Sequence, residues 1–153
     1  MHTNYLIYNT IDKIEVFDLE KGLIFHVNRK QSILDKYRLE YCDINENTFF
    51  IIEKYDFLLY STRKVIFNEL GYRAVFDKKG ILSFEGREIR FISQNYFRTK
   101  EIIYMNNIAI GEINRIKFTQ EIEEYEIVLN GEIEENKLLI LISFCLKSNF
   151  NFN

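Results

Sequence analysis

The chain has 153 residues and a formal net charge of -3, with 20 Lys and Arg against 23 Asp and Glu. Dedicated nucleic-acid-binding domains usually carry a clear basic excess, so this charge argues against that class. Hydrophobic residues make up 47% and aromatic residues 16% of the sequence, which excludes a disordered chain. The length predicts one domain, spanning residues 1–153.

The cysteines and the N-terminus predict a cytoplasmic protein. The sequence has two cysteines, Cys42 and Cys145, which is too few for a disulfide framework and indicates a reducing compartment. Residues 1–10 lack the basic segment and long apolar stretch of a secretory signal. The longest apolar stretch, residues 138–146, is much shorter than the roughly 20 residues that a transmembrane helix needs.

Most of the chain alternates between apolar and polar residues and is rich in Ile, Val, Phe and Tyr, which predicts β-strands. Segments 13–17, 88–91 and 115–118 place charge on one face, as in an antiparallel sheet wetted on one side. The side chains expected to face the core there are Ile14, Val16, Ile89, Phe91, Ile116 and Phe118. Further strands are expected at 5–8, 23–27, 38–42, 49–53, 57–60, 65–68, 72–76, 81–84, 102–105, 108–113 and 125–129.

Turns must be built from Asn, Asp, Lys and six glycines, because the sequence has no proline. Segments 76–80 and 105–107 predict tight hairpin connections, in which Gly or Asn supplies the positive φ angle. The sequence VFDLEKG at residues 16–22 is echoed by VFDKKG at 75–80, and a strand is expected after each. The echo has two interpretations: a duplicated hairpin, or turns that independently open with Asp and close with Gly.

Residues 133–147 are expected to form the one helix of the chain. Glutamates precede the apolar run LLILISFCL, and Lys147 follows it, which suits the helix dipole at both ends. Because apolar residues cover every side, such a helix must be buried all round. A fully buried strand is the alternative, and the leucine content favours the helix.

These expectations fit together in one fold class, a mainly β protein with one C-terminal helix. Strands with one wet face need an apolar cover, and a helix that is apolar all round needs walls on every side. A closed antiparallel barrel around a buried hydrophobic helix satisfies both needs and removes exposed sheet edges. A helix of about 15 residues would be roughly 22 Å long, a plausible barrel length.

The chain resembles the tubby C-terminal-like superfamily, which includes the LURP-one-related and scramblase-like proteins. The resemblance rests on the hairpins VFDKKGILSFEG and IIYMNNIAIGEI, the passage RIKFTQEIEEYEIVLNGEI and the closing run LLILISFCL. It covers about the last two thirds of the chain and is one of pattern. The resemblance implies a closed antiparallel barrel around a hydrophobic C-terminal helix. It also implies a binding role, because some members bind phosphoinositides or associate with membranes through basic residues on the barrel surface.

Neither a metal site nor a catalytic site is expected from the sequence. His2 and His26 lie far apart, and neither belongs to a ligand-spaced cluster, so His26 is interpreted as an ordinary, partly buried residue. No nucleophile elbow, P-loop or dinucleotide-binding glycine motif is present, and no pair of carboxylates is singled out. We therefore expect a protein that is not an enzyme and that carries no cofactor.

Two charged features suggest different partners. The glutamates between residues 121 and 135 form either a solvated surface or a docking surface for a basic protein. Basic residues near expected strand ends either protect edges or form an anion site if closure brings them together. They begin with Arg29 and Lys30, and the candidate ligand-binding residues among them are Arg63, Lys64, Lys78, Lys79, Arg98, Lys100, Arg115 and Lys117.

The sequence therefore favours a non-enzymatic binding module for anionic phospholipid headgroups or a membrane surface. Tyr96 and Phe97 lie beside Arg98, and amphipathic aromatic rings are favoured at a lipid interface. The alternative is a protein-interaction module, such as an inhibitor or immunity-type partner, that uses the Glu-rich surface 121–135.

Overall fold

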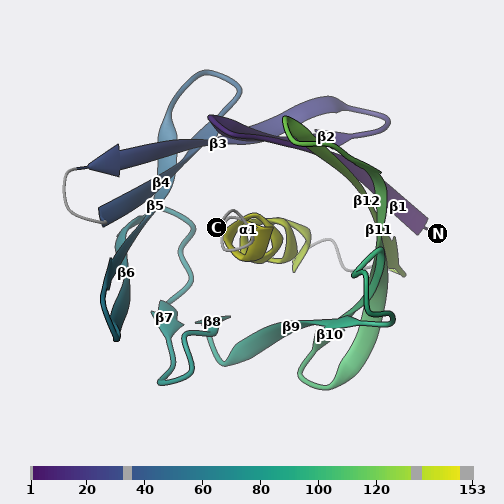
Figure 1. Cartoon of the computed structure of the whole chain (residues 1–153). Coiled ribbons are helices and arrows are strands. Elements are labelled where there is room, and N and C mark those ends of the chain that lie inside the picture. Colours follow the sequence, from purple (N-terminus) through teal and green to yellow (C-terminus); the bar gives the residue numbers. More distant parts are fainter. Residues whose placement is uncertain (1, 33–35, 132–135, 149–153) are drawn as a thin grey trace.

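The computed structural model of the chain describes residues 2–32, 36–131 and 136–148 (Figure 1). These residues form twelve strands and one α-helix, and the strands wrap around the helix. The elements are β1 His2–Thr10, β2 Lys13–Asp18, β3 Gly22–Ser32, β4 Lys36–Asp43, β5 Thr48–Phe57, β6 Tyr60–Asn68, β7 Ala74–Phe76, β8 Leu82–Phe84, β9 Arg87–Ser93, β10 Lys100–Met105, β11 Ile108–Phe118, β12 Ile122–Asn130 and α1 Lys137–Ser148. The prediction of a mainly β fold with one C-terminal helix is confirmed.

The strands form one antiparallel sheet in the order β6-β5-β4-β3-β2-β1-β12-β11-β10-β9-β8-β7. From β1 to β6 and from β7 to β12, each strand pairs with the next one along the chain. Strand β1 also pairs with β12, from His2 opposite Asn130 to Thr10 opposite Ile122. The two edges, β6 and β7, meet at a seam that side chains bridge. Arg63 donates to the carbonyl of Gly80 at 2.7 Å, and Asn68 donates to the carbonyl of Tyr72 at 2.6 Å. The barrel is therefore nearly closed.

The alternating direction of the strands divides the turns between the two ends of the barrel. Because each strand runs antiparallel to the next, the turns β1–β2, β5–β6, β7–β8, β9–β10 and β11–β12 lie at one end, which we call the mouth. The turns β2–β3, β4–β5, β8–β9 and β10–β11 lie at the other end, the base. Helix α1 starts at the base, where Arg87 bonds Asn136 at 2.7 Å, and ends at the mouth with Lys147 beside Glu101.

Helix α1 is enclosed by the sheet, as the sequence predicts. All residues from Leu139 to Leu146 are buried, so every side of the helix contacts the inner wall. Ser143, the one polar residue of this run, donates to the carbonyl of Leu139 at 2.8 Å. From the wall, the Tyr41 hydroxyl donates to the carbonyl of Ile142 at 3.1 Å. The expected helix residues 133–135 lie outside the described ranges.

The inward orientation expected for one strand is wrong, and so is one expected strand. Ile116 and Phe118 were expected in the core, but they are 55% and 63% exposed. Ile116 follows the inward-facing Ile113 by three residues, so the alternation along β11 turns it outward. The β-bulge between Arg115 and Lys117 then brings Phe118 opposite the buried Glu123, where it lines the open mouth of the barrel and not the core. Residues 57–60 were expected to be a strand, but β5 ends at Phe57 and β6 begins at Tyr60, with a two-residue turn between them. The other expected inward residues, Ile14, Val16, Ile89 and Phe91, belong to the core or pack against it.

The two echoed hairpins use the same turn chemistry at opposite ends of the barrel. Asp18 accepts bonds from the backbone amides of Glu20 and Lys21, and Asp77 accepts bonds from those of Lys79 and Ile81. The β2–β3 turn lies at the base, whereas the β7–β8 turn lies at the mouth. A duplicated two-strand unit would keep both turns at one end. The structure therefore favours the interpretation as independent Asp-opened turns.

We predict that the Ile142→Ala variant loses about 2–5 kcal/mol of unfolding free energy, because it leaves a cavity where the helix meets the wall. The matched control is Ile44→Ala, since Ile44 is exposed in the β4–β5 turn and its truncation should change stability by less than about 0.5 kcal/mol. Urea unfolding measured by circular dichroism compares the two variants. Equal midpoints would contradict the enclosed helix.

Candidate functional site

A cavity of about 290 Å³ opens at the mouth, beside the end of helix α1. Its polar lining comes from Arg98 in the β9–β10 turn, Glu101 on β10, Arg115 on β11, Glu123 on β12 and Lys147 on the helix. The aromatic lining residues are Tyr96, Phe97, Phe118, Tyr125 and Phe144. The cavity therefore combines cationic groups with aromatic walls at the point where the hydrophobic core ends.

The floor of this cavity is an inward-facing polar network. Glu123 is buried and accepts hydrogen bonds from the Asn9 amide at 3.0 Å and from the Tyr125 hydroxyl at 2.8 Å. Arg29 bonds the side-chain oxygen of Asn9 and the carbonyl of Thr10. Burial raises the pKa of Tyr125, and its hydrogen bond to Glu123 raises that pKa further, so Tyr125 remains a donor at neutral pH. The network satisfies a carboxylate that would otherwise be costly to bury.

Lys147 and Glu101 form the second polar contact inside the mouth. The Lys147 ammonium pairs with the buried Glu101 carboxylate and lies 5.3 Å from the centre of the Phe91 ring. Burial lowers the pKa of Lys147, and the hydrogen bond to Glu101 partly opposes that shift. The pair therefore neutralises two charges at the helix C-terminus, where a cation also complements the helix dipole.

Arg98 and Arg115 are the two predicted binding residues that the mouth cavity brings together. Arg115 donates to the carbonyl of Phe97 at 3.0 Å, and its guanidinium carbon lies 4.6 Å from the centre of the Phe118 ring. Arg98 has a positive φ of 54° in the β9–β10 turn, and its backbone amide donates to Asn95. This pair places two guanidinium groups on the walls of one aromatic-lined opening.

The other predicted binding residues share the mouth end without forming one cluster. Lys78 and Lys79 are exposed in the β7–β8 turn, and Arg63 ties β6 to that turn through Gly80. Lys64 is exposed on β6. Lys100 pairs with Glu112 at 3.0 Å, and Lys117 approaches Glu124 at 3.9 Å, so both have an acidic neighbour. The sequence thus identified residues of one barrel end, rather than residues of one pocket.

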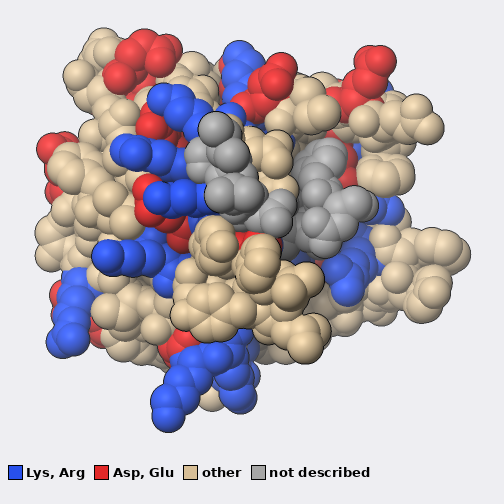
Figure 2. Space-filling model, turned by 60° about the vertical axis from the view of Figure 1, so that its left-hand side comes forward, with Lys and Arg blue, Asp and Glu red and all other residues tan. Residues whose placement is uncertain are grey.

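Lys and Arg side chains gather on the face shown in Figure 2, with Asp and Glu side chains between them. Several cations on β3, β4 and β5 are held by carboxylates, among them Lys30 with Glu40 at 2.7 Å and Lys36 with Glu53 at 3.3 Å. Exposed pairs of this kind contribute little to stability. Lys78 and Lys79, by contrast, are exposed in the β7–β8 turn of the mouth.

The two ends differ in the charges that their turns and strand ends carry. Among the described residues, those at the base include the acidic Asp18, Glu20, Asp43, Glu46, Glu69 and Glu85 and the basic Lys21, Arg73 and Arg87. Those at the mouth include the basic Lys13, Lys36, Lys78, Lys79, Arg98, Lys100, Arg115, Lys117 and Lys147 and the acidic Asp12, Asp56, Asp77, Glu101, Glu121, Glu123 and Glu124. The charge of the chain is therefore polarised along the barrel axis, although its net value is close to zero.

Large apolar side chains are exposed at the same mouth turns. They are Ile11 in β1–β2, Leu58 and Leu59 in β5–β6, Tyr96 and Phe97 in β9–β10, and Phe118 where β11 ends. The sequence pointed to Tyr96 and Phe97 but missed the leucines, because the apolar run 57–60 looked like a strand. It also missed the buried Glu101 and Glu123, since charged residues that face inward break the alternation used to find them.

The Glu-rich stretch is divided between the two faces of β12. Glu123 points inward and is buried, so it cannot belong to an exposed docking surface. Glu124 and Glu126 are half-buried on the other face, Glu121 is exposed in the preceding turn, and residues 132–135 lie outside the described ranges. The acidic surface in this part of the chain is thus smaller than the sequence suggested.

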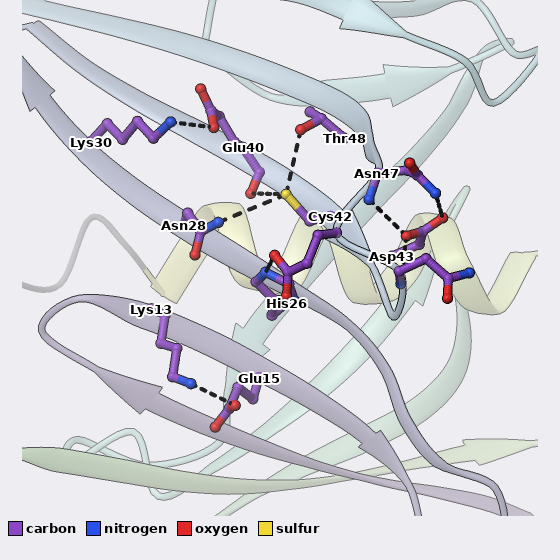
Figure 3. A network of polar contacts seen from close by, with 12 residues as sticks. Lys13, Glu15, His26, Asn28, Lys30, Glu40, Cys42, Asp43, Asn47 and Thr48 are labelled. Carbon is purple, nitrogen blue, oxygen red and sulfur yellow. Dashed lines mark hydrogen bonds and ion pairs between the residues drawn. The ribbon is translucent and has the colours of Figure 1, made fainter.

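His26 and Cys42 lie opposite each other on β3 and β4, on the outer face of the barrel. Figure 3 shows that the Cys42 sulfur points towards Asn28 and Thr48, whose polar atoms lie at 3.8 and 3.5 Å. His26 is buried and approaches Glu46 at 3.2 Å. Cys145 is enclosed in the helix core, where burial raises the pKa of its thiol. Polar neighbours and packing therefore account for these three side chains.

Within the described ranges, no group of three or more His, Cys, Asp and Glu side chains is placed to hold a metal ion. In the same described ranges, no helix is both long enough and apolar enough to cross a membrane.

Comparison with known proteins yields a fold and no family. No protein-family model matches the sequence, and no curated protein matches it. A solved structure does match, the X-ray structure of a protein from Arabidopsis thaliana, with a TM-score of 0.55 at 11% sequence identity. The match covers 97% of this chain and 91% of the Arabidopsis chain. At this identity the similarity shows a shared fold along almost the whole length of both chains.

We predict strong coupling between Lys147 and Glu101 in a double-mutant cycle. Glu101→Gln should lose about 3 kcal/mol of unfolding free energy, because it leaves a largely buried ammonium without its carboxylate. Lys147→Met combined with Glu101→Gln should lose less than the sum of the two single changes. The control cycle uses the exposed pair Lys13 and Glu15, for which less than about 1 kcal/mol of coupling is expected. Additive effects at 101 and 147 would refute the ion pair.

Proposed function

We propose that the chain is a non-enzymatic module that binds anionic membrane surfaces through the mouth of its barrel. The observation that carries the proposal is the charge polarity along the axis. In the described residues, the turns and strand ends of the mouth together carry more basic than acidic side chains, whereas those of the base are mainly acidic. A protein with a net charge of -3 needs such segregation to approach an anionic surface, since its overall charge opposes the approach.

The orientation that follows places the mouth against the lipid headgroups. Each Lys or Arg near an anionic surface contributes about 1 kcal/mol, so several must act together. Lys78, Lys79 and Arg98 lie in two neighbouring mouth turns and can contact the surface in the same orientation. The guanidinium groups of Arg98 and Arg115 suit phosphate oxygens, which they can bind through two parallel hydrogen bonds.

The proposal includes membership of the tubby C-terminal-like superfamily and a cytoplasmic location. The family is supported by the closed antiparallel wall around an apolar C-terminal helix, and some of its members bind phosphoinositides or membranes. A cytoplasmic location would expose the mouth to the anionic leaflet of the plasma membrane. Docking of a basic protein on the Glu-rich surface 121–135 stays an alternative from the sequence, and the burial of Glu123 speaks against it.

We predict that Lys78→Glu/Lys79→Glu binds phosphatidylserine vesicles at least about 30-fold more weakly than wild type, because it removes about 2 kcal/mol of attraction. The control is Lys21→Glu/Arg73→Glu, which changes two exposed cations at the base and lowers the net charge by the same amount. Vesicle flotation at low salt measures both variants.

The control variant should bind like wild type, and added salt should weaken wild-type binding, because exposed charges are screened beyond about 10 Å at 0.1 M. Neutral phosphatidylcholine vesicles test the lipid requirement. Failure of wild type to bind anionic vesicles at low salt would refute the proposed function. Capture of one basic protein, lost on Glu121→Lys/Glu124→Lys, would support the protein-interaction alternative in its place.

A further inference from the structure

The β5–β6 turn at the mouth exposes two consecutive leucines that make no core contact. Leu58 is 91% and Leu59 is 105% exposed, and the flanking Phe57 and Tyr60 are 51% and 65% exposed. Phe57 and Tyr60 pair directly across the hairpin, so the two leucines alone form its tip. Exposing these apolar side chains to water costs hydration free energy, and packing inside the chain does not offset that cost.

The backbone conformation of this turn is unfavourable for leucine. Leu58 has a φ of 51°, a region that Gly, Asn and Asp occupy in two-residue hairpin turns and that costs free energy for a leucine. The corresponding two-residue turns at the base each contain Asn or Gly, which suit a positive φ. The β10–β11 turn is Asn106-Asn107, with φ angles of 49° and 70°, and the β8–β9 turn is Glu85-Gly86, with 49° and 75°. Hairpin folding therefore does not explain the two leucines.

Other mouth turns repeat the pattern of an exposed apolar tip near basic residues. Ile11 is exposed in β1–β2, and Tyr96 and Phe97 are exposed in β9–β10 with their rings in edge-to-face contact, 5.5 Å apart. The cations of the mouth, Lys78, Lys79 and Arg98, lie in turns of the same end. In the base turns, by contrast, Leu19 and Ile44 are exposed singly between acidic or amide neighbours, and Ile108 is exposed where β11 begins, next to Asn107.

We propose that the Leu58-Leu59 tip inserts into the interfacial region of a lipid bilayer and anchors the mouth there. This inference rests on the proposed membrane function and adds a hydrophobic anchor to it. The cations bring the mouth to an anionic surface, and the leucines and aromatic tips then leave water for the boundary between headgroups and acyl chains. Amphipathic aromatic rings such as Tyr96 are favoured at that boundary, and apolar surface combined with basic charge is typical of interfacial binding.

Tryptophan fluorescence tests the anchor directly, because the natural chain contains no tryptophan. Leu59→Trp places a single reporter at the tip, and Ile108→Trp places a matched one at an exposed base turn. With phosphatidylserine vesicles, the Leu59→Trp emission should shift to shorter wavelength and be quenched by lipids brominated on their acyl chains. The Ile108→Trp emission should not change.

A second variant separates the anchor from hairpin folding. Leu58→Gly/Leu59→Asn places glycine at the positive φ of position 58 and a common turn residue at position 59, so the variant should be at least as stable to urea as wild type. Its partition coefficient on anionic vesicles should fall by about tenfold or more, since two leucines no longer leave water. The matched control, Ile44→Asn/Ile108→Asn at the base, should partition like wild type.

The outcomes separate this inference from the function on which it rests. If wild type floats with anionic vesicles while the Leu59→Trp emission stays unchanged, the anchor is wrong and electrostatic binding stands. If the Gly-Asn variant partitions like wild type, the anchor is equally refuted. If the Leu59 reporter inserts into neutral and anionic vesicles alike, the anchor stands and the electrostatic function falls. If wild type binds neither kind of vesicle, both are wrong.

Discussion

The helix that is apolar on every side is the constraint on which the rest of the structure depends. Residues Leu139 to Leu146 are all buried, so no orientation of α1 on a flat sheet would cover them. Burying each large aliphatic side chain contributes about 1.5–3 kcal/mol, and this sum makes wrapping of the sheet favourable. Wrapping in turn covers the inner face of every strand with one element. The same few helix residues therefore specify both the core and the shape of its wall.

Enclosure of the helix also determines where polar chemistry can occur. Helix α1 occupies the centre of the barrel, the place where other barrels enclose a ligand cavity (Figure 1). The inward-facing polar side chains accordingly collect where the helix ends. Glu101, Glu123 and Lys147 lie there beside Phe144 and around the mouth cavity. The two ends, with the turns that line them, become the surfaces that sequence change can reshape without disturbing the core.

The sequence predicted those parts of the fold that depend on local alternation and on composition. Ile14, Val16 and Ile89 were placed correctly because each belongs to a regular strand in which successive side chains change face. Ile116 was misplaced because segment 115–118 was considered apart from Ile113, whose inward position turns Ile116 outward. The bulge that follows depends on the register against β12, which no local pattern records. The apolar run 57–60 was misassigned for a related reason, since turn residues are normally polar.

The candidate site was predictable in its residue types and not in its geometry. Lys78 and Lys79 could be assigned to a turn from the sequence alone, whereas their distance from Arg98 depends on the order of strands in the sheet. The buried Glu101 and Glu123 could not be recognised, because their partners Lys147 and Asn9 lie far from them in the sequence. Contacts between distant segments thus define the mouth.

The strand order determines which turns share an end of the barrel, and so which side chains meet on that surface. In an antiparallel sheet whose neighbours follow the chain order, alternate turns must lie at the same end, whatever their sequence. A chain can therefore make its two ends chemically different simply by giving odd and even turns different residues. Here one set carries Leu58, Leu59, Lys78, Lys79 and Phe97, and the other is richer in acidic residues, among them Glu20, Glu46 and Glu85. Turn residues contribute little to the core, which is built around α1. Folding therefore places little restriction on which residues the turns at each end carry. Binding at the mouth gives a physical reason for exposed leucines in a turn that folding alone would build from glycine or asparagine.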